Sequence, residues 1–133
     1  MRRVFADSFY FFALGNPRDA AHSRAMAFNQ LFAGQLITTG WIVTEIGDGM
    51  ALPSQRPIFV RLAEQLRTDA DVVFVPCTDA LMSAGIELFG QRPDKNWSLT
   101  DCTSFVVMQR ERLVEALTGD HHFEQAGFVA LLK

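Results

Sequence analysis

Short apolar segments that resemble buried strands alternate with helix-like segments along the whole chain. The strand-like segments are residues 3–6, 36–39, 71–75, 116–118 and 128–132. Between them, apolar residues recur at helical spacing, and the expected helices cover residues 8–14, 19–32, 41–52, 57–66, 80–89, 100–110 and 121–126, with Gly34 as the expected cap of the second. This alternation predicts an α/β fold in which a mostly parallel sheet lies between helices.

The length and composition indicate one domain with a substantial core. The chain has 133 residues, 49% of them apolar, so we expect residues 1–133 to form a single domain. The unbroken apolar stretch near the N-terminus, residues 9–14, is far shorter than the roughly 20 residues of a membrane span. Only two cysteines are present, so no disulfide framework is expected. We therefore expect a cytoplasmic protein without membrane association.

Four acidic residues stand near the ends of the expected elements. Asp7 follows the first strand, Asp120 follows the fourth, Asp101 opens a helix, and Glu45 lies within the helix that follows the second strand. Ligands of α/β sheets bind beyond the carboxyl ends of the strands. The four carboxylates are therefore candidates for one binding site.

Each aspartate also has a structural interpretation. Asp7 and Asp120 stand where N-caps of the following helices are expected, and Ser98 with Asp101 matches a capping box. Taken singly, capping is the more common role for an aspartate in such a position. The sequence leaves both interpretations open.

Capping does not explain Glu45, and it explains only part of the position of Asp101. Glu45 shares the inward stripe of its helix with Ile42 and Ile46, and Asp101 stands at the head of a core-facing row that continues with Phe105. Buried acids need a partner, and no lysine or arginine occupies a matching inward position. The partner is then an external cation or another acid that shares a proton.

Carboxylates without cationic partners are the ligands that Mg²⁺ prefers, and Mn²⁺ accepts the same donors. Two such ions, about 3.5–4 Å apart, can hold the attacking and leaving oxygens of a phosphodiester displacement. The net charge of −3 at first excludes partners that need a broadly basic surface. If four acids line a metal site, however, the remaining charges nearly balance, and bound cations reverse the local sign.

Several segments resemble those of PIN-domain nucleases. They are residues 4–8 (Val-Phe-Ala-Asp-Ser), residues 16–19 with His22 and Ala25, the pair Thr44 and Glu45, residues 94–105, and residues 117–128. The resemblance covers essentially the whole chain in the right order. It implies a three-layer α/β/α fold and metal-dependent cleavage of RNA.

The resemblance also implies roles for individual residues. Asp7, Glu45, Asp101 and Asp120 would form the catalytic and metal-binding site for Mg²⁺ or Mn²⁺, and supporting hydroxyls would come from Ser8, Thr44, Ser98 and Thr118. At this size, the chain is most similar to VapC-type toxins of type II toxin–antitoxin pairs. Such proteins act on RNA, form homodimers and are held inactive by a cognate antitoxin.

Three further residue types have less specific interpretations. His121 and His122 are adjacent on a short helix, where side chains point about 100° apart, so we expect a solvent-facing or phosphate-contacting role before joint metal ligation. Cys102 is expected to be a small core residue, because no base is paired with it. Trp97 either stacks on a base or packs under its loop.

Two other functional classes compete with a nuclease. One is a catalytically silent PIN-like module that regulates through a protein partner. The other is a small phosphotransfer domain, which would need a lysine at a later strand end, and only Lys95 and Lys133 are present. The first is the main alternative. A housekeeping nuclease, not paired with an antitoxin, is also compatible with the sequence.

Overall fold

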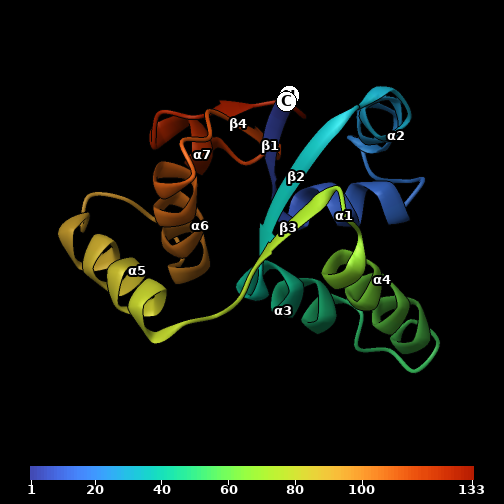
Figure 1. Cartoon of the computed structure of the whole chain (residues 1–133), viewed down its shortest axis with the longest axis horizontal. Coiled ribbons are helices and arrows are strands. Elements are labelled where there is room, and N and C mark those ends of the chain that lie inside the picture. The colour runs from blue at the N-terminus through green and yellow to red at the C-terminus, as the bar shows by residue number, and fades with distance from the viewer.

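A central sheet of five parallel strands organises the protein. The computed structural model describes residues 1–133, and its strands are β1 (Arg2–Ala6), β2 (Gly34–Thr39), β3 (Val72–Val75), β4 (Glu115–Leu117) and β5 (Val129–Ala130). They lie in the order β3-β2-β1-β4-β5, and every neighbouring pair is parallel. Helices flank the sheet on both faces (Figure 1). The predicted α/β sandwich is confirmed.

Seven helices connect the strands. They are α1 (Ser8–Gly15), α2 (His22–Leu31), α3 (Gly40–Gly49), α4 (Arg56–Thr68), α5 (Asp79–Gln91), α6 (Leu99–Arg110) and α7 (His121–Gln125). The chain steps from β1 to β2 to β3 in one direction and then returns to place β4 and β5 on the other side of β1. Because such crossovers are right-handed, α1 to α4 cover one face and α5 to α7 cover the other, as Figure 1 shows.

The core forms around the central strand. Val4, Phe5 and Ala6 of β1 are fully buried, as expected for a strand covered on both faces. The ring of Phe123 in α7 packs against Phe5 at 6.2 Å and edge-on against Phe105 of α6 at 5.0 Å between ring centroids. These contacts hold α6 and α7 together next to β1 and β4. No helix combines the length and the apolar character that a membrane crossing requires.

The role expected for Gly34 is wrong. Helix α2 ends at Leu31, with Phe32 at its C-cap, and Gly34 is the first residue of β2. It pairs with Arg2 of β1, and a Cβ at position 34 would lie 2.2 Å from the backbone oxygen of Arg2. Glycine therefore permits the close approach of the two strands.

Besides α2, which covers His22–Leu31 where residues 19–32 were expected to be helical, two expected elements are shorter in the structure. Helix α3 ends at Gly49, where residue 52 was the expected end, and the amide of Met50 bonds to the carbonyl of Gly47 in a tighter turn. Strand β5 covers only Val129–Ala130, because its neighbour β4 has three residues and only two of them find partners in register. The apolar segment 128–132 contributes to the core beyond the strand, through Leu132.

Candidate active site

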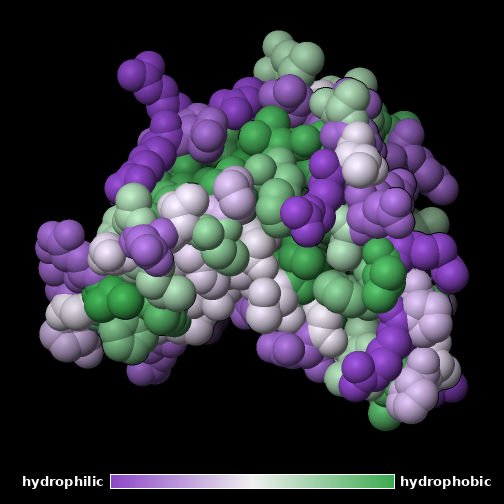
Figure 2. Space-filling model, turned by 60° about the horizontal axis from the view of Figure 1, so that its bottom comes forward, coloured by the Kyte–Doolittle hydropathy of each residue, from purple (hydrophilic) through white to green (hydrophobic).

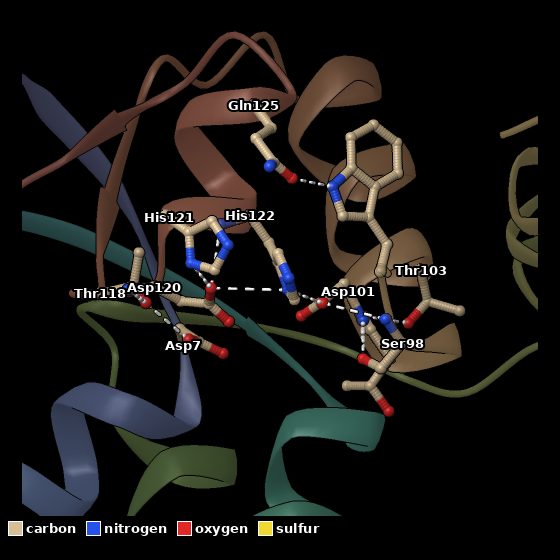
Figure 3. Close-up of polar contacts among 11 residues, drawn as sticks. Asp7, Ser98, Asp101, Thr103, Thr118, Asp120, His121, His122 and Gln125 are labelled. Carbon is tan, nitrogen blue, oxygen red and sulfur yellow. Dashed lines mark hydrogen bonds and ion pairs between the residues drawn. The ribbon is translucent and has the colours of Figure 1, made fainter. Parts of the chain in front are cut away.

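The candidate site lies where the strand order reverses, at the carboxyl ends of β1 and β4. Ala6 and Leu117 are partners in register, so the residues that follow them, Asp7 and Thr118, emerge side by side. The hydroxyl of Thr118 donates a hydrogen bond of 2.8 Å to Oδ2 of Asp7 (Figure 3). This is the position at which open α/β sheets bind ligands.

Asp7 is a buried carboxylate without a basic partner. It is 7% exposed and stands at the N-cap position of α1, but its side chain makes no capping hydrogen bond. Burial raises the pKa of Asp7 to about 7, the Thr118 bond lowers it, and the nearby charges of Glu45 and Asp101 raise it. The capping interpretation is therefore wrong for Asp7.

Asp120 lies next to this pair and does cap a helix. Its amide donates to the Thr118 hydroxyl at 3.1 Å, and its Oδ1 accepts from the amide of His122 at 2.9 Å, at the start of α7. Its other carboxylate oxygen, Oδ2, has no protein hydrogen-bond partner. Capping and ligand binding are therefore compatible in one side chain.

Asp101 also uses one carboxylate oxygen to cap a helix and leaves the other unpaired. It forms a complete capping box with Ser98: the amide of Asp101 donates to Oγ of Ser98 at 2.9 Å, and the amide of Ser98 donates to Oδ2 of Asp101 at 3.0 Å. Nδ1 of His122 lies 2.9 Å from the same Oδ2. Both contacts fall on Oδ2, so Oδ1 of Asp101 has no protein partner.

Glu45 completes the cluster from α3. It is half-buried, and burial raises the pKa of its carboxyl group, whereas a hydrogen bond from the Ser8 hydroxyl lowers it. The charges of Asp101 and Asp120 raise the pKa further. The mutual electrostatic effects of these carboxylates indicate that Glu45, Asp101 and Asp120 lie near one another.

The four predicted supporting hydroxyls have different positions. Thr118 bonds to Asp7, Ser98 bonds to Asp101 through the capping box, and the Ser8 hydroxyl lies near Glu45 and lowers its pKa. Thr44 is exposed, and its hydroxyl donates at 2.9 Å to the carbonyl of Gly40 one turn earlier in α3. The structure therefore brings three of the hydroxyls to the acids but engages Thr44 within its own helix.

His122 is a polar neighbour of the acids that the sequence interpretation missed. Its side chain is 19% exposed and contacts Asp101, whereas that of His121 is 63% exposed. The solvent-facing role is thus wrong for His122. The sequence feature that could have indicated this position is Phe123. Its ring packs against Phe105 of α6 and so brings His122 to the start of α6.

The alternatives for Trp97 and Cys102 are resolved. Trp97 is 6% exposed, packs edge-on against Phe105 at 5.0 Å, and donates from Nε1 to Gln125 at 3.0 Å. It therefore packs under its loop and is not free to stack on a base. Cys102 is fully buried and unpaired, as expected of a core residue.

The donor set fits a hard divalent cation. No lysine or arginine forms an ion pair with any of the four acids; the arginine and lysine pairs lie elsewhere on the surface. Asp101 and Asp120 each accept hydrogen bonds through one carboxylate oxygen and leave the other oxygen available to a cation. Oxygen donors that are held in place but not neutralised are what Mg²⁺ and Mn²⁺ require.

Comparison with known proteins finds no matching family model and no matching curated protein. Among solved structures, the chain is similar to VapC20 from Mycobacterium tuberculosis, described as a sarcin–ricin loop cleaving toxin. The two are 25% identical with a TM-score of 0.85, over 95% of this chain and 96% of that chain.

The fold is also similar to that of FitAcB from Neisseria gonorrhoeae. The identity is 16% and the TM-score 0.66, over 96% of this chain and 94% of that chain. The resemblance to VapC-type PIN-domain proteins is thus confirmed by the similarity of structure. The chain has the fold of the VapC-type PIN-domain proteins, the family that its sequence resembles.

Proposed function

We propose that this chain is a metal-dependent endoribonuclease, with residues 1–133 forming the nuclease domain. The observation that carries the proposal is the cluster of Asp7, Glu45, Asp101 and Asp120, which have no lysine or arginine partner at the carboxyl ends of β1 and β4. Burial raises the pKa of Asp7 to about 7, which is the expected state of a buried metal ligand when no metal is bound. The fold that the chain shares with VapC20 supports an RNA substrate.

The four acids would hold Mg²⁺ or Mn²⁺. When bound, the cation lowers the pKa of a water molecule and compensates the charge of the phosphate group. The protein contributes orientation: Thr118 fixes Asp7, and the capping bonds fix Asp101 and Asp120 while leaving one oxygen of each unpaired. The Ser8 hydroxyl favours the charged form of Glu45. Without a cation, the same acids would repel an RNA phosphate.

We also propose that the protein is a cytoplasmic toxin that is paired with a cognate antitoxin and forms a homodimer. Exposed apolar side chains on α4 (Ile58, Val60) and α5 (Ile86, Phe89) support protein partners. Figure 2 shows apolar groups on both sides of the notch that separates these two parts of the molecule. A cavity of about 650 Å³, whose lining includes Phe11, Phe12 and Leu14 of α1 and Ile58 and Leu62 of α4, adds a recessed and partly apolar surface.

The test is cleavage of RNA by the purified protein, freed of any co-purified antitoxin. Total RNA and intact ribosomes are incubated with Mg²⁺ or Mn²⁺, and parallel samples contain excess EDTA. We expect cleavage that EDTA abolishes and that Glu45→Gln reduces by about 100-fold or more. Glu64→Gln, the same exchange at an exposed position of α4, is the matched control and should cleave like the wild type.

Three outcomes would count against the proposal. Equal cleavage in EDTA would contradict metal dependence. Equal cleavage by Glu45→Gln would contradict the site. A folded protein that cleaves no RNA with either metal would favour the silent regulatory module.

A further inference from the structure

The start of α7 places two imidazoles against one carboxylate. Nδ1 of His121 lies 3.6 Å from Oδ1 of Asp120, and Nδ1 of His122 lies 3.5 Å from the same oxygen. The three candidate ligand atoms all lie within 4.8 Å of one another. Figure 3 shows the His121 ring next to the carboxylate of Asp120 and the His122 ring between the carboxylates of Asp120 and Asp101.

The convergence follows from the cap of the helix. Asp120 is the N-cap, so its carboxylate lies across the end of α7 and not along its side, and both of the next two side chains can turn toward it. The two rings are 4.5 Å apart between centroids and inclined at 51°. The angular separation of consecutive helical residues therefore does not keep these two nitrogen atoms from facing the same point.

Several contacts hold the arrangement in place. The amide of His122 bonds to Oδ1 of Asp120 at 2.9 Å, whereas Nδ1 of His122 lies 2.9 Å from Asp101 and would leave that contact to bind an ion. The next residue, Phe123, is fully buried between β1 and α6. Only His121 is largely exposed, which gives an ion access from solvent.

The donor set differs in chemistry from the acidic cluster. Imidazole nitrogen is a ligand for Zn²⁺ and other transition metals, whereas Mg²⁺ takes oxygen donors. With Zn²⁺ bonds of about 2.0–2.1 Å to nitrogen and oxygen, tetrahedral ligands lie roughly 3.3 Å apart. The two nitrogen–oxygen distances, 3.5 and 3.6 Å, are close to that separation before any ion is bound.

We propose that Asp120, His121 and His122 form a Zn²⁺ site that inhibits the nuclease, with water in the remaining position. Each neutral imidazole would carry its proton on Nε2 and bind the ion through the Nδ1 lone pair. His122 would then lose its contact with Asp101, and Asp120 would be engaged by Zn²⁺. Zn²⁺ would thus alter the contacts of Asp101 and Asp120, two of the four acids proposed to bind the catalytic cation. The inhibitory consequence rests on the proposed function, but the metal site does not.

The test of the site uses Zn²⁺ binding as its readout. Metal-free Asp7→Asn protein, which lacks the most buried acid of the cluster but keeps all three ligands, is titrated with Zn²⁺ by calorimetry. We expect one equivalent to bind. Adding His121→Ala to this background should weaken binding at least tenfold, and because His121 is exposed, this variant should fold.

The third histidine provides the control. His22 lies in α2, with Nδ1 at 2.7 Å from the carbonyl of Ala13, remote from the site in the fold, and His22→Gln should bind Zn²⁺ as before. Co²⁺ in place of Zn²⁺ should give the strong visible absorption of a tetrahedral ion, and His121→Ala should lose it. The absence of binding, or equal affinity with and without His121, would overturn the proposal.

Inhibition is tested separately. Each variant is compared with its own Zn²⁺-free rate of Mg²⁺-dependent RNA cleavage. One equivalent of Zn²⁺ should reduce the cleavage rate of the wild type at least tenfold. The His121→Ala variant should need at least tenfold more Zn²⁺ for the same reduction in rate. Zn²⁺ binding without inhibition would overturn the regulatory part. If no protein cleaves RNA at all, the proposed function fails, while the calorimetry still decides the site.

Discussion

Thr118 and Asp7, which directly follow the carboxyl ends of β4 and β1, form a buried side-chain hydrogen bond of 2.8 Å. Thr118 is completely buried, and its hydroxyl also accepts the amide hydrogen of Asp120. One hydroxyl thus connects two of the proposed metal ligands. It stabilises the charged form of Asp7 against the burial that favours the neutral form.

Replacing this hydroxyl should change the pH dependence of the enzyme. In Thr118→Val the side chain keeps its shape but cannot donate a hydrogen bond, so the pKa of Asp7 should rise further. The pH at which activity falls to half on the acidic side of the pH–rate profile (its acidic limb) should therefore increase by about one pH unit. Thr118→Ser, which keeps the donor, is the control and should retain the wild-type limb. Rates measured from pH 5 to 9 at fixed Mg²⁺ check this. Identical limbs for Thr118→Val and the wild type would show that the bond does not control Asp7.

The raised pKa of Asp7 also makes a prediction about the stability of the metal-free protein. The carboxyl group titrates near 3.8 when unfolded and at about 7 when folded, so its contribution to stability is complete below pH 3.8 and is lost as the pH rises to 7. Asp7→Asn cannot ionise, so in EDTA it should be more stable than the wild type at pH 8, by at most about 4 kcal/mol. The difference should shrink toward pH 4. Denaturant unfolding at several pH values measures it, and a difference independent of pH would contradict the account.

Metal binding should reduce this difference in stability. Mg²⁺ or Mn²⁺ at about 100 times its dissociation constant should stabilise the wild type by about 2.7 kcal/mol through binding to the folded state. Asp7→Asn should gain far less, because it lacks one ligand. Thermal unfolding with and without the metal, at pH 8, tests this. An equal shift in both proteins would place the metal elsewhere.

Much of the fold and of the acidic cluster could be predicted from the sequence. The apolar strand ending at Asp7 and the helix stripe containing Glu45 are local patterns, and the sheet rule that ligands bind at carboxyl ends indicates the edge at which the acids gather. The capping and binding interpretations of Asp101 and Asp120 seemed to be alternatives. A carboxylate has two oxygens, however, and the structure uses one for capping and leaves the other unpaired.

The parts that were missed depend on packing between elements distant in sequence. His122 reaches Asp101 because Phe123 packs on Phe105, and periodicity within a five-residue helix cannot show this. Thr44 lies beside Glu45 in sequence, but its helical position leaves it exposed and bonded to Gly40. Gly34 was interpreted as a helix cap, although its function is to let β2 approach β1.

One buried hydroxyl offers a test of the packing itself. Oγ of Ser104 in α6 has no hydrogen-bond partner, while its neighbour Thr103 bonds to the carbonyl of Thr100. Because an unpaired buried hydroxyl is costly, Ser104→Ala should raise the free energy of unfolding by about 1 kcal/mol. Thr103→Val, which removes a paired hydroxyl, should lower it and serves as the contrast. Chemical denaturation measures both, and a destabilised Ser104→Ala would show that the hydroxyl has a partner in solution.

The central claim is that the four carboxylates act together as a metal-dependent site for RNA cleavage. The most direct measurement is the single-turnover cleavage rate of Asp101→Asn and the wild type over a range of Mg²⁺ concentrations. The asparagine oxygen can still accept the capping bond from Ser98, so the fold should persist while one charged ligand is lost. We predict a rate at least about 100-fold lower at every Mg²⁺ concentration, in a protein that remains folded. A rate within about twofold of the wild type would contradict the account.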